Sequence, residues 1–168
     1  ALGVGVLVGL FNGTVVIKTG VPPFVVTLGM MGIARGLALV ITKGSSVSGL
    51  PSGYLFIGQG FLLGVPLPVW LMIAVGIISH LFLTYTTTGR HIYFIGSNEE
   101  AARLCGIAVN KIKLLVFSIT ATLAAFASVI ETARMSTAQP GTGVGYELQA
   151  IGAVIIGGAS LFGGSGTI

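Results

Sequence analysis

Residues 23–42 read PFVVTLGMMGIARGLALVIT, and this stretch decides the fold class. It carries one charged residue, Arg35, over the length of about 20 residues that crosses the hydrocarbon core of a bilayer as an α-helix. Pro23 suits the first helical turn, because the N–H that proline lacks would have no helical partner there. The stretch therefore predicts a transmembrane helix.

The composition of the whole chain agrees with this prediction. Of its 168 residues, 54% are hydrophobic and 7% are charged, whereas soluble domains carry roughly 25% charged residues. A soluble fold could not cover its surface with so few charges, but a surface that faces hydrocarbon does not need them. We therefore expect an all-α, polytopic helical membrane protein.

Other apolar segments flank this helix. Those at residues 1–17, 69–85 and 114–130 bring the expected number of spans to about four. In the first of them Gly5, Gly9 and Gly13 lie on one helix face, the small-xxx-small pattern of a tightly packed helix pair. Shorter apolar runs are predicted to be partial or re-entrant elements, and the last of them a half-helix: residues 54–57, 61–65 and 148–156.

Lys and Arg are distributed unevenly among the predicted loops. The polar stretch 86–113 holds Arg90, Arg103, Lys111 and Lys113, so the positive-inside rule places it in the cytoplasm. Alternation of spans then puts Lys18 inside and Lys43 and Arg134 outside. The net charge of +4 is explained in this way without nucleic acid, since the basic residues are scattered and no aromatic platform accompanies them.

A short helix is predicted inside the polar stretch, over residues 98–105. Ser97 and Glu100 match a capping box, in which each side chain satisfies an exposed N–H at the helix start. Glu99 and Arg103 are four residues apart and can pair across one turn. Gly106 is placed to end the helix. An ordinary connecting loop would not need such caps, whereas a rigid cytoplasmic helix can transmit force from a soluble partner.

The stretch from Gly89 to Ile107, with residues 110–113 after it, resembles the coupling loop of bacterial ABC importer permeases of the ribose/xylose/galactoside type. Residues 24–36, 136–140, 143–151 and 157–164 resemble further signatures of that family. The resemblance covers essentially the whole chain, in order. The complete permease is larger, so the chain is expected to be a single partial permease domain over residues 1–168, with its coupling loop at residues 88–113.

The resemblance implies partners and a location. Two permease subunits would form the translocation path in the bacterial inner membrane, two cytoplasmic ATPase subunits would dock on the coupling helices, and a periplasmic or extracellular solute-binding protein would deliver a sugar. The residues that would couple to the ATPase lie in and beside the short helix: Ser97, Asn98, Glu99, Glu100, Ala101, Ala102, Arg103, Leu104 and Gly106.

The chain itself is not expected to be an enzyme. The sequence has no Gly-x-x-x-x-Gly-Lys-Ser/Thr phosphate loop, so ATP hydrolysis would fall to a partner chain. His80 and His91 have no second ligand at metal spacing, and the single Cys105 offers neither an intrachain disulfide nor a metal cluster. No catalytic residue, metal or cofactor is predicted.

Candidates for the translocation path are mostly polar residues in or beside apolar segments, because such residues tend to face the interior of a helix bundle. Asn12, Thr27, Gln139 and Gln149 could instead each satisfy a neighbouring backbone group, and Glu147 is explained by the helix dipole alone. Arg35 and Glu131 are predicted at similar depth and as an intramembrane ion pair. The path candidates are Asn12, Phe24, Thr27, Gln139, Glu147 and Gln149.

Two other functions stay open. A secondary, ion-coupled transporter would also contain broken helices, but it would want an acidic residue at mid-depth, and the acidic residues here fall at helix ends or in the cytoplasmic loop. A channel or structural protein would not need a capped cytoplasmic helix. The sequence favours an importer permease subunit for a pentose, hexose or similar small polar solute, without identifying the solute.

Overall fold

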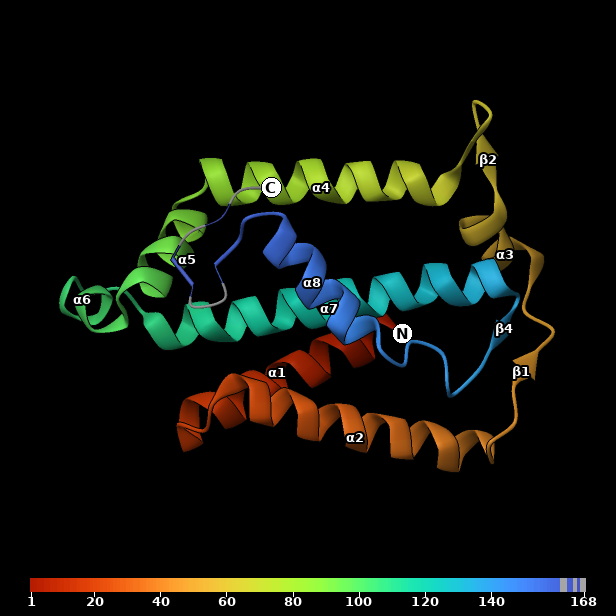
Figure 1. Ribbon diagram of the computed structural model, residues 1–168, viewed down its shortest axis with the longest axis horizontal. Coiled ribbons are helices and arrows are strands. Elements are labelled where there is room, and N and C mark those ends of the chain that lie inside the picture. Colours follow the sequence, from red (N-terminus) through yellow and green to blue (C-terminus); the bar gives the residue numbers. More distant parts are fainter. Residues whose placement is uncertain (161–162, 165, 167–168) are drawn as a thin grey trace. The chain divides into compact units, whose positions relative to one another are not determined.

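The computed structural model describes residues 1–160, 163, 164 and 166. Within these residues, four helices are long and apolar enough to cross a membrane: α1 (Leu2–Thr19), α2 (Pro23–Thr42), α4 (Leu67–Tyr85) and α7 (Val109–Met135) (Figure 1). The shorter helices are α3 (Ser52–Gln59), α5 (Thr87–Ser97), α6 (Glu99–Leu104) and α8 (Tyr146–Ile156). The predicted all-α polytopic fold is confirmed, with α3 and α8 as partial elements.

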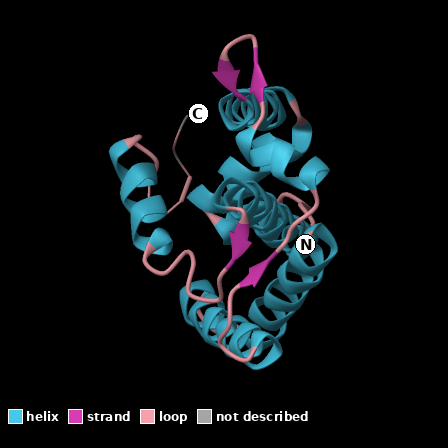
Figure 2. Ribbon diagram, turned by 90° about the vertical axis from the view of Figure 1, so that its right-hand side faces the viewer, coloured by secondary structure: helices cyan, strands magenta, loops and turns pink. Residues whose placement is uncertain are grey.

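Short strands join some of the loops (Figure 2). β1 (Val47–Ser48) pairs antiparallel with β4 (Thr137–Ala138), and β2 (Phe61–Leu62) pairs with β3 (Val65–Pro66). The second pair is a hairpin whose turn residues, Leu63 and Gly64, have φ values of 55° and 78°, as a type I′ turn requires. The strands were not predicted, because two-residue ladders leave no alternating pattern in a sequence. Residues 61–65, predicted to be a partial or re-entrant element, form most of this hairpin instead.

The chain forms two compact units. The first comprises Ala1–Trp70 and Lys113–Thr142, and the second Leu71–Ile112 and Gly143–Ile168. The first therefore holds α1, α2, α3 and most of α7, whereas the second holds most of α4 together with α5, α6 and α8.

In the first unit, α1 packs against α7 through its glycine face. A Cβ atom at Gly5 would lie 2.6 Å from Ala125 Cβ, and one at Gly9 would lie 2.7 Å from the Phe117 carbonyl oxygen. A Cβ at Gly13 would lie 2.9 Å from Leu114 Cδ1. The contacts run in opposite directions along the two helices, so the helices are antiparallel. The predicted close helix pair is confirmed, and α7 is its second member.

The helix α3 covers the end of α7 in the same unit. Tyr54 Oη donates a hydrogen bond to the Val129 carbonyl at 3.1 Å, and Gln59 Nε2 donates to the Arg134 carbonyl at 3.2 Å and to Ser136 Oγ at 2.6 Å. The last carbonyls of a helix have no partner within it, and Gln59 supplies one. With eight residues, α3 is too short to span a bilayer, and it serves as a cap on a helix that does.

Candidate functional site

The segment that leads to α6 contains a helix, α5, that was not predicted from the sequence. Between α4 and α5, Thr86 Oγ1 accepts a hydrogen bond from the Gly89 amide at 3.0 Å and donates one to the Phe82 carbonyl at 2.6 Å. Gly89 is buried against the Leu83 carbonyl, where a side chain would not fit. Thr86 was the available signal, since a threonine before a run with spaced apolar residues is typical of a helix start.

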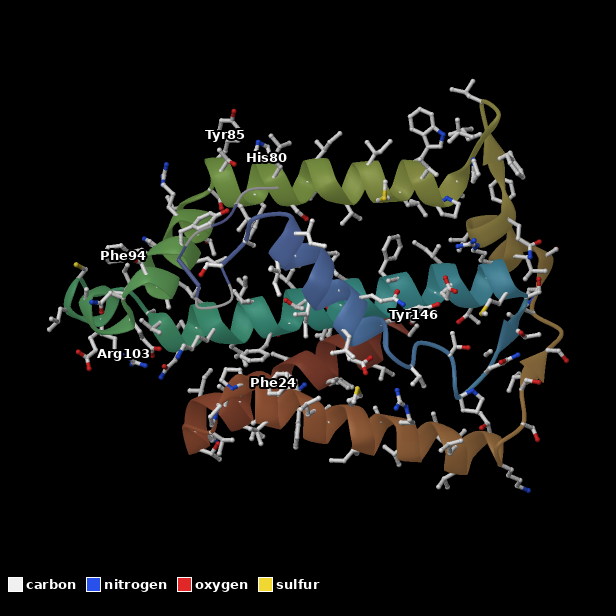
Figure 3. All side chains as sticks on the ribbon, viewed as in Figure 1. Phe24, His80, Tyr85, Phe94, Arg103 and Tyr146 are labelled. Carbon is white, nitrogen blue, oxygen red and sulfur yellow. The ribbon has the colours of Figure 1, made fainter. Side chains whose placement is uncertain are left out.

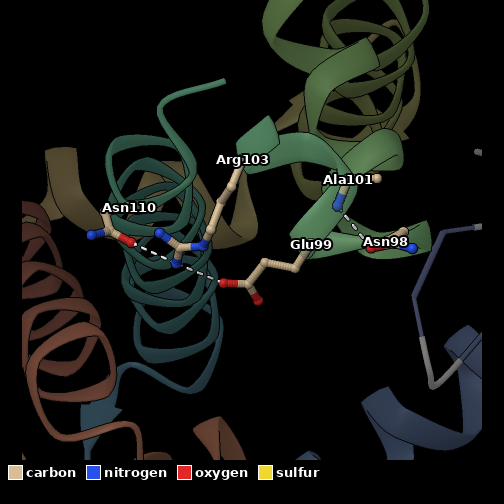
Figure 4. Close-up of polar contacts among 5 residues, drawn as sticks. All are labelled: Asn98, Glu99, Ala101, Arg103 and Asn110. Atoms are coloured by element: carbon tan, nitrogen blue, oxygen red, sulfur yellow. Dashed lines mark hydrogen bonds and ion pairs between the residues drawn. The ribbon is translucent and has the colours of Figure 1, made fainter. Parts of the chain in front are cut away.

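The N-terminal cap of α6 is Asn98. Its Oδ1 accepts a hydrogen bond from the Ala101 amide at 2.9 Å (Figure 4). The predicted capping box, which begins at Ser97, is wrong because Ser97 is the last residue of α5. An N-cap residue needs an extended backbone, and Asn98 has it, with φ −154° and ψ 106°. The cap therefore falls one residue later than predicted.

The C-terminal end of α6 is closed by Gly106, as predicted. Gly106 has φ 78°, a left-handed conformation that glycine adopts at little cost. Its amide donates to the Arg103 carbonyl at 3.0 Å, and the Ile107 amide donates to the Ala102 carbonyl at 3.1 Å. These two bonds form a Schellman motif, so α6 has its own caps at both ends.

Arg103 connects α6 to the first turn of α7 (Figure 4). Its Nη2 lies 2.8 Å from Glu99 Oε1 and 3.1 Å from Asn110 Oδ1. The Arg103 and Glu99 side chains are 51% and 38% exposed, and a solvent-exposed helical ion pair contributes only about 0.3–0.5 kcal/mol. The main consequence is geometric, because the same guanidinium group holds both helices.

The two faces of α6 differ in burial. Ala102 is fully buried and Val109, at the start of α7, is 2% exposed, whereas Leu104 is 90% exposed. An exposed leucine alone is common. Here it projects from a short, separately capped helix whose other face is anchored, so it offers an apolar contact held in a fixed position. Figure 3 labels the neighbouring residue, Arg103, on the same short helix.

Removal of the N-cap tests the local stability of α6. We expect Asn98→Ala to lower it by about 1 kcal/mol, because the Ala101 amide loses its acceptor. Amide hydrogen exchange in residues 99–104 should become roughly fivefold faster, while exchange in α2 stays unchanged. Asn98→Ser, which restores a capping oxygen, is the control, and equal exchange in all three proteins would contradict the assigned cap.

The path candidates of the first unit have different surroundings. Asn12 is 7% exposed, and its Oδ1 has no hydrogen-bond partner within the described residues. Thr27 Oγ1 donates to the carbonyls of Pro23 and Phe24, each at 3.0 Å, and Phe24 is 63% exposed (Figure 3). Gln139 lines a pocket of about 340 Å³ between the loops that β1 and β4 join; its other lining residues are Leu39, Gly44, Ser46, Pro140 and Gly141.

The remaining candidates do not complete a path. In the second unit, Glu147 is half-buried in the first turn of α8 and Gln149 is exposed. A salt bridge within the described residues joins Glu99 to Arg103. A path lined by the candidate residues and the Arg35–Glu131 pair both stay predictions.

Comparison with known proteins connects these features to a family. The chain is 47% identical to the ribose import permease protein RbsC of Escherichia coli strain K12, over 100% of this chain and 54% of that protein. It is 43% identical to the RbsC protein of Bacillus subtilis, over 94% of this chain and 49% of that one. The L-arabinose transport system permease protein AraH of Escherichia coli is 42% identical, over 94% and 48%. The chain thus spans about half the length of these curated relatives.

The match to a family model extends over nearly the whole chain. Residues 1–165 match the model described as the branched-chain amino acid transport system / permease component. No solved structure matches the chain. The predicted resemblance to importer permeases and the predicted multi-pass location in the bacterial inner membrane are confirmed by this match together with the four apolar helices. The chain therefore belongs to the branched-chain amino acid transport system / permease component family.

Proposed function

We propose that the chain is the part of a transmembrane importer subunit that receives the conformational change of an ATPase partner. The observation that supports this most directly is α6, a helix capped at both ends that buries Ala102 and exposes Leu104. Its neighbouring side chains, Glu100 and Arg103, are also exposed. A partner at the cytoplasmic face would contact Leu104 and be oriented by the charges around it.

A movement of α6 would reach the membrane through α7. Arg103 bonds to Asn110 in the first turn of α7, a helix of 27 residues. The close glycine contacts of α1 then make it move with α7, because backbones packed at this distance leave no gap to absorb a displacement. The proposed mechanism is alternating access, in which closure of the ATPase pair shifts α6, and α7 and α1 follow.

The solute would be a sugar or a similar small polar molecule. The relatives are named as permeases for ribose, L-arabinose and, at 38% identity, autoinducer 2. A pocket of about 340 Å³ with Gln139 in its wall falls within the size range of small-molecule sites. We propose it as an entry point from the outer face, where a solute-binding protein would deliver the solute to a dimer of permease subunits. These relatives do not support the ion-coupled alternative.

The test is made on the complete permease with its ATPase. Alanine at Glu99, Glu100 and Arg103 together should weaken ATPase association by about tenfold, corresponding to about 1.4 kcal/mol, and should lower solute uptake, while membrane insertion stays normal. Lys43→Ala, which removes a charge at the predicted outer face, is the control. Unchanged ATPase association and unchanged solute uptake in the triple variant would contradict the proposal.

A further inference from the structure

The end of α5 is in close backbone contact with a glycine-rich segment near the end of the chain. A Cβ atom at Gly96 would lie 2.5 Å from the Gly164 amide nitrogen, and one at Gly164 would lie 2.9 Å from the Ser97 nitrogen and Cα. All of these residues belong to the second unit. Gly163 and Gly164 have φ values of 87° and 77°, in the left-handed region where other residues are strained. Glycine is therefore needed on both sides of the contact.

A hydrogen bond supports the same contact one turn earlier in α5. Tyr93 Oη donates to the Gly166 carbonyl at 2.9 Å, and the Tyr93 side chain is half-buried. We name Gly163, Gly164 and Gly166 the glycine clasp. It meets α5 at Tyr93, Gly96 and Ser97, so it reaches the residue directly before Asn98, the cap of α6.

The glycine clasp also follows α8 closely along the chain. α8 ends at Ile156, where the Gly158 amide donates to the Ile155 carbonyl at 3.0 Å and the Ala159 amide to the Val154 carbonyl at 3.1 Å. Few residues separate this closed helix end from Gly163. Because this connection is short, the location of the clasp constrains the location of the end of α8. This half-helix carries the path candidates Glu147 and Gln149.

We propose that the glycine clasp positions α6 and links it to α8, so that a displacement of α6 reaches two membrane elements, α7 through Arg103 and α8 through the clasp. Tyr93 and Gly96 are then positioning residues for transport. The role in transport rests on the function proposed above, whereas the positioning of α6 does not. The hydrogen bond from Tyr93 and the close backbone approach at Gly96 can each be removed by a separate substitution.

Two variants of the complete permease test the clasp, each with a matched control. Tyr93→Phe removes the hydrogen bond without adding an atom, and Tyr85→Phe is its control, since Tyr85 is 72% exposed (Figure 3). Gly96→Ala places a Cβ against Gly164, whereas Gly76→Ala adds one in another helix where nothing lies within 4 Å. Both alanines raise helix propensity equally, so only the contact distinguishes them.

The first measurement is amide hydrogen exchange of residues 99–104 in the permease without its partner. Tyr93→Phe should speed it by up to about tenfold, the range expected for the loss of one hydrogen bond, and Tyr85→Phe should leave it unchanged. The second is the number of solute molecules imported per ATP hydrolysed in the assembled complex. We expect this ratio to fall severalfold for Tyr93→Phe and Gly96→Ala with ATPase association intact.

The outcomes separate the two proposals. Wild-type exchange and a wild-type ratio in Tyr93→Phe would overturn the clasp, whatever Gly96→Ala does. Faster exchange with an unchanged ratio would overturn its role in transport. If the coupling variants at Glu99, Glu100 and Arg103 keep full ATPase association, the proposed function fails, and exchange in Tyr93→Phe still decides whether the clasp positions α6.

Discussion

Leu104→Asp in the complete permease is expected to abolish most of its association with the ATPase partner and to stop solute uptake. Leu104 is 90% exposed, so the substitution disturbs no interior packing, and α6 keeps Asn98 and Gly106 as its caps. An apolar anchor at the centre of a protein interface contributes 2 kcal/mol or more, which corresponds to a loss of about 30-fold or more in affinity. Co-purification and uptake in vesicles measure the effect.

The matched control is Leu63→Asp. Leu63 is 87% exposed in the turn between β2 and β3, and this turn is predicted at the outer face. The two variants thus make the same chemical change at similar exposure, at positions predicted on opposite sides of the membrane. Equal ATPase association in Leu104→Asp and Leu63→Asp would show that α6 does not carry the contact.

Gly9→Leu is expected to prevent the close packing of α1 on α7. A Cβ atom at Gly9 would already lie 2.7 Å from both the Phe117 carbonyl oxygen and Ser118 Cα, and these backbone atoms cannot rotate aside. Overpacking costs about 1–3 kcal/mol where side chains can adjust, and a backbone clash should reach the upper end of that range. Thermal unfolding of the detergent-purified permease should begin at a clearly lower temperature, with a reduced folded yield.

Gly3→Leu is the control in the same helix. No atom lies within 4 Å of a Cβ placed at Gly3, so the same added side chain meets open space. Both substitutions raise helix propensity and hydrophobicity equally, and only the contact with α7 differs. If the two variants unfold at the same temperature, the glycine face of α1 does not determine the stability of this helix pair.

Features encoded by local chemistry were predictable from the sequence. The span at residues 23–42 coincides with α2, and the face of Gly5, Gly9 and Gly13 is the face that meets α7. Gly106 ends α6 because its left-handed backbone depends only on the absence of its own side chain. In each case the sequence signal that carries the prediction lies within a few residues or repeats along one helix.

Other features were missed for two different reasons. The cap of α6 fell on Asn98 because α5 continues through Ser97, and α5 itself was missed although the local signal of its start, Thr86, was present in the sequence. The hydrogen bond from Tyr54 to Val129 and the pairing of β1 with β4 join segments far apart in sequence. A single sequence has no periodic signal for such contacts. The residues that line the translocation path are also determined by contacts between distant segments, so the sequence alone does not identify them.

The double capping of α6 has a kinetic consequence. Asn98 and Gly106 order this helix within the isolated chain, so a partner does not have to fold it on contact. The conformational entropy that disordered segments lose on binding is already lost here. Association with α6 should therefore be a single docking step at a rate set by diffusion and orientation, and variants in its contact residues should differ mainly in how fast the complex dissociates.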